Sequence, residues 1–208
     1  MKYLKYYENI DPFEEEWEFE EPYTEFENWL LTEYPDENKW SGIKELDCYN
    51  NNLTSLKGIE NLTNLERLRC SYNKLTSLEG IENLRNLKEL YCSRNNLTSL
   101  EGIENLTILK YLYCSNNNLT SLEGIENLRN LKMIDCYNNN LTSSKGIENL
   151  TILKILNCSY NNLTSLEGIE NLSNLKYLYC SNNNFSLFAK LKIEIFCKKN
   201  NIDFQLGF

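Results

Sequence analysis

One cysteine recurs every 22 residues through most of the chain, and this period constrains the fold more than any other feature. The cysteine ladder consists of Cys48, Cys70, Cys92, Cys114, Cys136, Cys158 and Cys180. Asparagines keep the same period from Asn51 to Asn183, and glycines keep it from Gly58 to Gly168. A fixed period of roughly 20–50 residues is typical of solenoids, in which each repeat packs only on its neighbours. The sequence therefore predicts a repeat domain.

The positions within one repeat predict its local structure. In residues 87–108, the alternation around Leu90 and Cys92 predicts a short strand whose leucine and cysteine point inward. Seven such strands should stack in parallel at about 4.8 Å. The apolar residues that follow are spaced by three, which favours a 3₁₀ or extended return path, with a bend at Gly102. The Asn95 amide is expected to satisfy backbone groups of its own and the adjacent coil.

The repeat spacing LxxLxCxxNxLxxLxxIxxLxx over residues 43–187 resembles the leucine-rich-repeat family. It is most similar to the 22-residue subclass found in a regulatory subunit of protein phosphatase 1 and in bacterial internalins. The cysteine-bearing repeats are also similar to those of leucine-rich-repeat proteins of giant amoebal viruses. The resemblance implies an α/β solenoid, a horseshoe with a parallel β-sheet on its concave face, a 3₁₀ or extended convex side, and a cap at each end. It also implies a signalling or scaffolding role.

The sequence divides into three expected segments. Residues 1–42 form an acidic, aromatic and partly helical N-terminal cap, residues 43–187 form seven repeats, and residues 188–208 form a C-terminal helical cap. Thr24 and Glu27 give a capping-box signal for a helix that should end at Pro35. For residues 1–21, two interpretations stay open: a part of the cap, or a disordered partner-binding segment.

A helix is also expected near the C-terminus. Its apolar stripe is predicted at Phe188, Leu191, Ile195 and Phe196, and the stripe ends in lysines. Together with Ile202, Phe204, Leu206 and Phe208, this helix should close the last repeat.

Seven cysteines in a row could suggest disulfides, a metal site or a nucleophile, and the geometry argues against each. Neighbouring parallel strands hold their Cβ atoms about 4.8 Å apart, farther than the ~3.8 Å typical of a disulfide. A linear file of thiols cannot surround a zinc ion tetrahedrally, so no metal site is expected. The chain has no histidine to activate a thiol. The ladder is therefore predicted to be a column of small buried side chains, whereas Cys197, which breaks the period, is expected to be more accessible.

Composition narrows the function further. Without histidine, no Ser-His or Cys-His pair is possible, and no phosphate-binding glycine motif occurs, so we expect neither an enzyme nor a cofactor. The net charge of −9 lies mainly in residues 1–40, which contain thirteen Asp or Glu and three Lys. Because no basic region stands out, nucleic acid is not an expected partner. No signal peptide or membrane anchor is recognised, which favours a cytoplasmic, intracellular protein without a membrane partner.

A binding surface is expected on the outward positions of the strands, which form the concave face. Charged residues occupy these positions in the first repeats, and aromatic or aliphatic residues occupy them later. We predict that an unidentified protein or peptide binds this surface at Tyr91, Tyr111, Tyr113, Met133, Ile155, Tyr177 and Tyr179.

Other interpretations remain open. Tyrosine also suits strands, so these rings could stack on one another without any partner. Alternatively, the chain is a secreted or surface adhesion module of the internalin type. A third possibility is a carrier for an acidic, partner-binding N-terminal segment.

Overall fold

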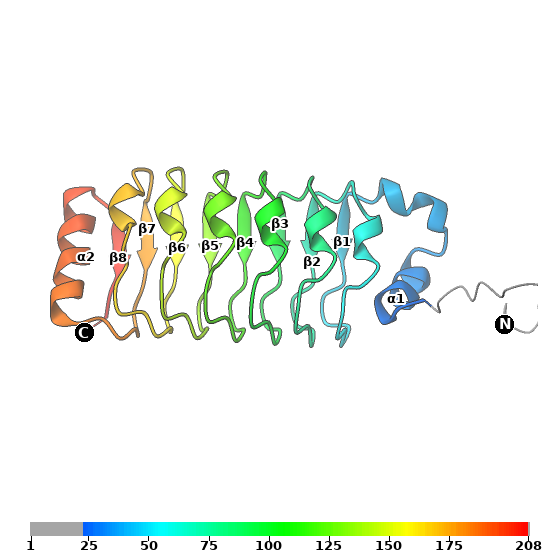
Figure 1. The fold of residues 1–208 in the computed structure, drawn as a ribbon, viewed down its shortest axis with the longest axis horizontal. Coiled ribbons are helices and arrows are strands. Elements are labelled where there is room, and N and C mark those ends of the chain that lie inside the picture. The colour runs from blue at the N-terminus through cyan, green and yellow to red at the C-terminus, as the bar shows by residue number, and fades with distance from the viewer. Residues whose placement is uncertain (1–22, 208) are drawn as a thin grey trace, which may run out of the picture.

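The chain forms an elongated solenoid around a single parallel sheet (Figure 1). The computed structural model describes residues 23–207, so the alternatives for residues 1–21 and the packing expected of Phe208 fall outside the described residues. Eight strands lie in sequence order across the sheet. They are β1 Glu45–Asp47, β2 Arg67–Arg69, β3 Glu89–Tyr91, β4 Tyr111–Tyr113, β5 Met133–Asp135, β6 Ile155–Asn157, β7 Tyr177–Tyr179 and β8 Asp203–Gln205.

Each repeat strand is three residues long and has a buried aliphatic residue at its centre. In β3, Leu90 is fully buried between two half-buried neighbours, and Cys92 directly after the strand is also fully buried. The register advances by 22 residues from one repeat strand to the next, so Leu90 pairs with Leu68 and Leu112. The predicted inward alternation of leucine and cysteine is confirmed.

The asparagine ladder joins each coil to the next, as expected. The Nδ2 of Asn95 donates to the carbonyl oxygens of Cys92 at 3.1 Å and of Cys70 at 3.0 Å. Its Oδ1 accepts a hydrogen bond from the backbone N–H of Leu75 at 3.0 Å. One amide therefore satisfies backbone groups of two adjacent coils, which explains why a polar residue is buried at this position.

The return path of each repeat is a 3₁₀ turn preceded by a glycine, which confirms both expectations. These turns are η2 Ile59–Asn61, η3 Ile81–Asn83, η4 Ile103–Asn105, η5 Ile125–Asn127, η6 Ile147–Asn149 and η7 Ile169–Asn171. The glycine before η4, Gly102, has φ +91°, a left-handed conformation that a side chain disfavours. The leucines and the isoleucine of each return path face the strands. Together with the inward residues of the strands they form a core that runs the length of the solenoid.

Within the described residues, the N-terminal side of the first repeat carries α1, Glu25–Glu33, followed by η1, Glu37–Gly42. The capping box is present as predicted: the Thr24 hydroxyl accepts from the Glu27 N–H, and the Glu27 carboxylate accepts from the Thr24 N–H. Phe26 and Leu30 are fully buried in the core, so α1 covers the end of the first repeat.

The C-terminal cap differs from the sequence expectation in two ways. Helix α2, Leu187–Lys199, is present, but it buries Ile193 and Cys197 and leaves Phe188, Leu191 and Ile195 exposed. The predicted inward stripe was therefore wrong, except for the half-buried Phe196. In addition, β8 pairs with β7 as an eighth rung, beyond the seven strands expected.

One repeat has a small gap in its core packing. Ser144 occupies a position that is leucine in the other repeats, and it is 5% exposed. Its hydroxyl donates to the carbonyl oxygen of Glu167 at 3.3 Å. A small apolar cavity lies beside it, lined among others by Leu122, Leu141 and Leu166. The core is thus less completely filled here than in the neighbouring coils.

Candidate protein-interaction surface

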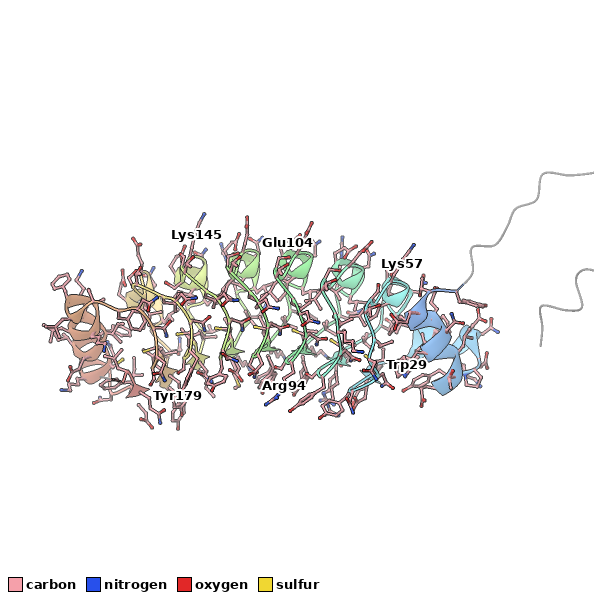
Figure 2. All side chains as sticks on the ribbon, turned by 90° about the horizontal axis from the view of Figure 1, so that it is seen from below. Trp29, Lys57, Arg94, Glu104, Lys145 and Tyr179 are labelled. Carbon is pink, nitrogen blue, oxygen red and sulfur yellow. The ribbon has the colours of Figure 1, made fainter. Side chains whose placement is uncertain are left out.

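The outward side chains of the strands form one continuous surface, which we call the sheet face. The register places these side chains in two columns across the sheet. The first column is Glu45, Arg67, Glu89, Tyr111, Met133, Ile155, Tyr177 and Asp203. The second column is Asp47, Arg69, Tyr91, Tyr113, Asp135, Asn157, Tyr179 and Gln205. Tyr179 projects on the strand side, away from Lys57, Glu104 and Lys145 on the 3₁₀ side (Figure 2).

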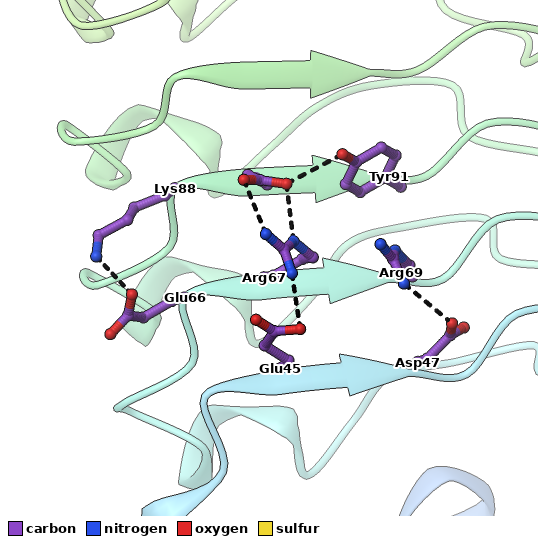
Figure 3. Close-up of polar contacts among 8 residues, drawn as sticks. Glu45, Asp47, Glu66, Arg67, Arg69, Lys88 and Tyr91 are labelled. Carbon is purple, nitrogen blue, oxygen red and sulfur yellow. Dashed lines mark hydrogen bonds and ion pairs between the residues drawn. The ribbon is translucent and has the colours of Figure 1, made fainter.

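The N-terminal part of the sheet face is a network of ion pairs (Figure 3). Arg67 lies between two carboxylates: its Nη1 is 2.7 Å from Glu45, and its Nε and Nη2 donate to both oxygens of Glu89 at 2.8 and 3.1 Å. Arg69 pairs with Asp47 at 3.6 Å. The charges of this region therefore compensate one another across neighbouring strands.

The guanidinium of Arg67 also changes the titration of its partner. Its hydrogen bonds lower the pKa of Glu89 against the opposing effect of partial burial. Glu89 accepts a further hydrogen bond from the Tyr91 hydroxyl at 3.0 Å. The pKa of Tyr91 is raised to about 12, mainly by burial and secondly by this hydrogen bond to a carboxylate. The phenol of Tyr91 is thus already engaged within the protein.

The rings of Tyr91 and Tyr113 stack on each other. Their centroids are 4.5 Å apart and their planes differ by 6°. The guanidinium of Arg69 lies 5.6 Å from the Tyr91 centroid on the neighbouring strand. Much of the ring surface of these two tyrosines is therefore covered by contacts within the sheet itself.

The C-terminal part of the sheet face has a different character. Tyr111, Met133, Ile155 and Tyr177 are consecutive in the first column, and their side chains are half-buried except for Tyr177, which is 41% exposed. Tyr179 adds a half-buried ring beside Tyr177. Within residues 23–207, the hydroxyls of Tyr111, Tyr177 and Tyr179 make no hydrogen bond. This patch presents to solvent an apolar surface together with phenol groups that are not engaged by other side chains of the described residues.

The structure brings the seven predicted site residues together only in part. In the second column, Asp135 and Asn157 separate Tyr113 from Tyr179. The Asn157 Nδ2 donates to Asp135 at 3.0 Å, and burial raises the pKa of the Asp135 carboxyl. The predicted residues thus form a continuous stripe along the first column with a polar interruption beside it.

Sequence reasoning missed two contributions to this surface. The strand β8 extends the columns by Asp203 and Gln205, which the alternation of apolar residues over 202–206 could have indicated. The ring of Tyr160 packs 5.0 Å from that of Tyr137, and Tyr160 is 49% exposed. Its backbone has φ +57°, a left-handed conformation that recurs at the equivalent position of every repeat. Asparagine occupies four of these seven positions, and its tolerance of this conformation could have signalled the turn.

The cysteines contribute no reactive group to the surface. All eight are unpaired and buried. Burial raises the pKa of Cys92 to about 12, and the Cys92 thiol donates to the carbonyl oxygen of Tyr113 at 3.4 Å. Cys197 is also fully buried, so the expected accessibility of this residue was wrong. Across the part of the chain that the structure describes, no group of three Cys, Asp or Glu side chains is placed to hold a metal ion.

Comparison with protein families gives a match over most of the chain. The model of paired leucine-rich repeats matches residues 41–84, 63–106, 109–150 and 153–192. The chain belongs to the leucine-rich-repeat family. Members of this family are typically non-catalytic modules that bind other proteins. A search of curated proteins found no relative of the chain.

Solved structures of other leucine-rich-repeat proteins share the fold. An internalin of Listeria monocytogenes has a TM-score of 0.71 at 25% identity, over 82% of this chain and 48% of the internalin. A leucine-rich-repeat protein of Leptospira interrogans gives 0.62 at 29%, over 80% and 49%. Internalin C2 of L. monocytogenes gives 0.63 at 21%, over 88% and 91%. This leucine-rich-repeat chain spans about half the length of the first two proteins. Among the described helices, none is long and apolar enough to cross a membrane.

Proposed function

We propose that this leucine-rich-repeat chain binds a protein or peptide through an apolar patch on its sheet face. The patch consists of Tyr111, Met133, Ile155, Tyr177 and Tyr179, and the stacked rings of Tyr91 and Tyr113 form its margin beside the ion-pair network. The observation that carries the proposal is the column of four consecutive apolar side chains on β4 to β7, which face solvent on a single surface. Tyrosine and methionine are enriched at the centres of protein interfaces.

The contrast between the two parts of the sheet face supports this location. On β1 to β3, Arg67 and Arg69 are paired with carboxylates of neighbouring strands. A partner would have to replace these contacts, which costs desolvation of each charge. On β4 to β7, a partner can cover apolar carbon atoms and accept hydrogen bonds from Tyr111 and Tyr177. Binding there stabilises a complex without disrupting an existing network.

We also propose that the chain works inside the cell. The fully buried, unpaired cysteine ladder suits a compartment in which thiols stay reduced. The rival is a secreted or surface adhesion module, which the similarity to internalins favours. Fractionation of the source cells, followed by detection with an antibody, separates the two: recovery from the medium or the cell surface would support adhesion.

The binding proposal is tested by capturing partners from the source cells and repeating the capture with variants. Tyr111→Ala combined with Tyr177→Ala removes the rings at the two ends of the run of four apolar side chains in the first column. For any partner held by the patch, we expect the dissociation constant measured by calorimetry to rise at least about tenfold. A partner that binds the double variant with unchanged affinity would overturn the proposed location.

Two controls make the result specific. Ile108→Ala combined with Ile152→Ala removes apolar side chains that are each 36% exposed in the loops before β4 and β6, and it should leave affinity unchanged. Deletion of residues 1–21 tests whether the acidic segment is the binding element instead. If that deletion abolishes binding and the tyrosine variant does not, the solenoid acts as the carrier.

A further inference from the structure

Helix α2 exposes an apolar stripe that has no cover in the described part of the chain. Leu187, Phe188, Leu191 and Ile195 are 85, 66, 51 and 57% exposed. No large hydrophobic residue elsewhere in residues 23–207 is more than 50% exposed. Four such side chains gathered on thirteen residues of helix mark an interaction surface.

The charge around this stripe restricts what can cover it. Helix α2 contains Lys190, Lys192, Lys198 and Lys199 and one acidic residue, Glu194, which pairs with Lys198. Its net charge is therefore +3, in a chain whose net charge is −9. Lys192 and Lys199 are exposed on the same side of the helix as Phe188. A partner with aromatic groups set among carboxylates would match this surface.

The chain itself contains such a sequence. Residues 11–21 read DPFEEEWEFEE, with seven carboxylates, three aromatic residues and neither lysine nor arginine. We propose that this acidic segment of one copy docks on the apolar stripe of α2 in a second copy. Phe13, Trp17 and Phe19 supply apolar contacts, and the glutamates between them face the lysines.

A groove beside the stripe fits an aromatic ring. It lies between η7 and α2, and its lining includes Phe188, Ala189, Lys192 and Phe196. Two carboxylates, Glu167 and Glu170, complete the opposite wall. Glu167 and Glu170 would repel a carboxylate on their wall, whereas the indole of a tryptophan can stack on the apolar side and donate its N–H to one of these glutamates.

The dimensions of the molecule require that donor and acceptor belong to different copies. Trp17 lies six residues before Tyr23, a reach of at most about 22 Å for a fully extended chain. The seven steps from β1 to β8 alone cover about 34 Å. Helix α1, which begins two residues after Tyr23, lies beyond β1, at the end opposite α2 (Figure 1). Trp17 therefore cannot reach the α2 of its own molecule.

Because each copy has one donor segment and one acceptor helix, the contact is head-to-tail. Association should then depend on concentration, and it continues beyond a dimer unless two antiparallel copies exchange their segments and close the assembly. It should also weaken several-fold when the salt concentration rises from about 0.05 to about 0.5 M, because the exposed charges become screened.

Two complementary variants test the proposal by sedimentation velocity. The first is a chain lacking residues 1–21, which keeps the acceptor. The second is Phe188→Asp combined with Leu191→Asp, which keeps the donor; both side chains are mostly exposed, so folding should persist. We expect each variant alone to be monomeric at concentrations where the full chain associates. An equimolar mixture of the two should form a one-to-one dimer that grows no further.

Two further double variants test whether the lysines of α2 contribute to docking. Lys192→Glu combined with Lys199→Glu should weaken association of the full chain at least about tenfold. Ile108→Asp combined with Ile152→Asp, at exposed apolar positions elsewhere, should not.

The other occupants of the stripe give different outcomes. If two α2 helices pack together, the chain lacking residues 1–21 dimerises by itself. If the stripe binds anionic lipid, the full chain stays monomeric and cosediments with phosphatidylserine vesicles but not with phosphatidylcholine vesicles. Either result, or a full chain that stays monomeric without vesicle binding, overturns the proposal.

Discussion

The Nδ2 of Asn95 donates a hydrogen bond to the carbonyl oxygen of Cys70 at 3.0 Å, across the boundary between two coils. The same amide group contacts the carbonyl of Cys92 and the N–H of Leu75. Asn95 is 7% exposed, so water cannot readily replace these partners. Each internal asparagine of the ladder therefore acts as a link between neighbouring repeats.

Asn95→Ala should strongly destabilise the protein, because it leaves buried backbone groups of two coils without partners. We expect a loss of about 3 kcal/mol in the free energy of unfolding, measured by urea denaturation. Asn51 provides the matched control: its Nδ2 donates to Tyr49 and its side chain is exposed. Asn51→Ala should cost less than about 1 kcal/mol. Equal losses for the two variants would show that the link between coils is not the cause.

Ser144→Leu should stabilise the protein. The backbone already accommodates leucine at the equivalent position of other repeats, such as Leu122 and Leu166, and the new side chain would fill the adjacent cavity. The variant loses the hydrogen bond to Glu167, but the buried leucine outweighs this loss. We expect the free energy of unfolding to rise by about 1 kcal/mol. For a chain of this length, that corresponds to about 2–4 °C in melting temperature, measured by calorimetry.

The matched control for Ser144 is Ser99→Leu, which places a leucine at an exposed position of another repeat. It should change the melting temperature by less than about 1 °C, since little apolar area becomes buried. A decrease for Ser144→Leu would mean that this coil has shifted to fit serine.

The repeat body follows from the sequence because its signals agree at every level. The 22-residue period gives the register, the alternation gives the inward face, and the positive φ of Gly102 explains why glycine recurs before each 3₁₀ turn. The two caps are not repeated along the chain, so they lack these mutually consistent signals. Helix α2 has apolar residues on both sides, Ile193 and Cys197 on one and Leu191 and Ile195 on the other. Its own sequence does not determine which side packs inward.

The candidate site was predictable in position but not in detail. Repeat register alone places Tyr91 and Tyr113 side by side, and the structure has them on adjacent strands. That the Tyr91 hydroxyl binds Glu89, and that Arg67 bridges two carboxylates, depends on rotamers chosen among several partners. These choices decide which tyrosines are engaged internally and which are available to a partner.

Two acidic residues of the sheet face should give opposite pH responses. The pKa of Glu89 is lowered in the folded protein, so its charge stabilises the fold above the unfolded pKa near 4.5. This contribution is lost as the pH falls through the folded pKa. Glu89→Gln should therefore lower stability at pH 7 and make the decline in acid shallower, as measured by urea denaturation between pH 7 and 3.

The pKa of Asp135 is raised by burial, so its ionised form opposes folding at pH 7. Asp135→Asn retains an oxygen that can accept from Asn157 and from the Tyr137 N–H. We expect this variant to be more stable than the wild type at pH 7, with the difference shrinking as the pH falls through the folded pKa of Asp135. The same sign of change for both variants at pH 7 would contradict these assignments.

The cysteine ladder should be chemically inert in the folded protein. The ladder thiols are almost fully buried, and burial raises the pKa of Cys92 to about 12 and of Cys197 to about 11. Since the thiolate is the reactive form, modification requires both exposure and ionisation. At pH 8, all eight thiols should react with a disulfide reagent at least about 100-fold more slowly in buffer than in denaturant.

Asn96→Cys, at an exposed loop position, adds one thiol that should react rapidly in the native state and so verifies the assay. Fast reaction of Cys197 alone would indicate that α2 opens from the last repeat, whereas fast reaction of several ladder thiols would contradict their placement in the core.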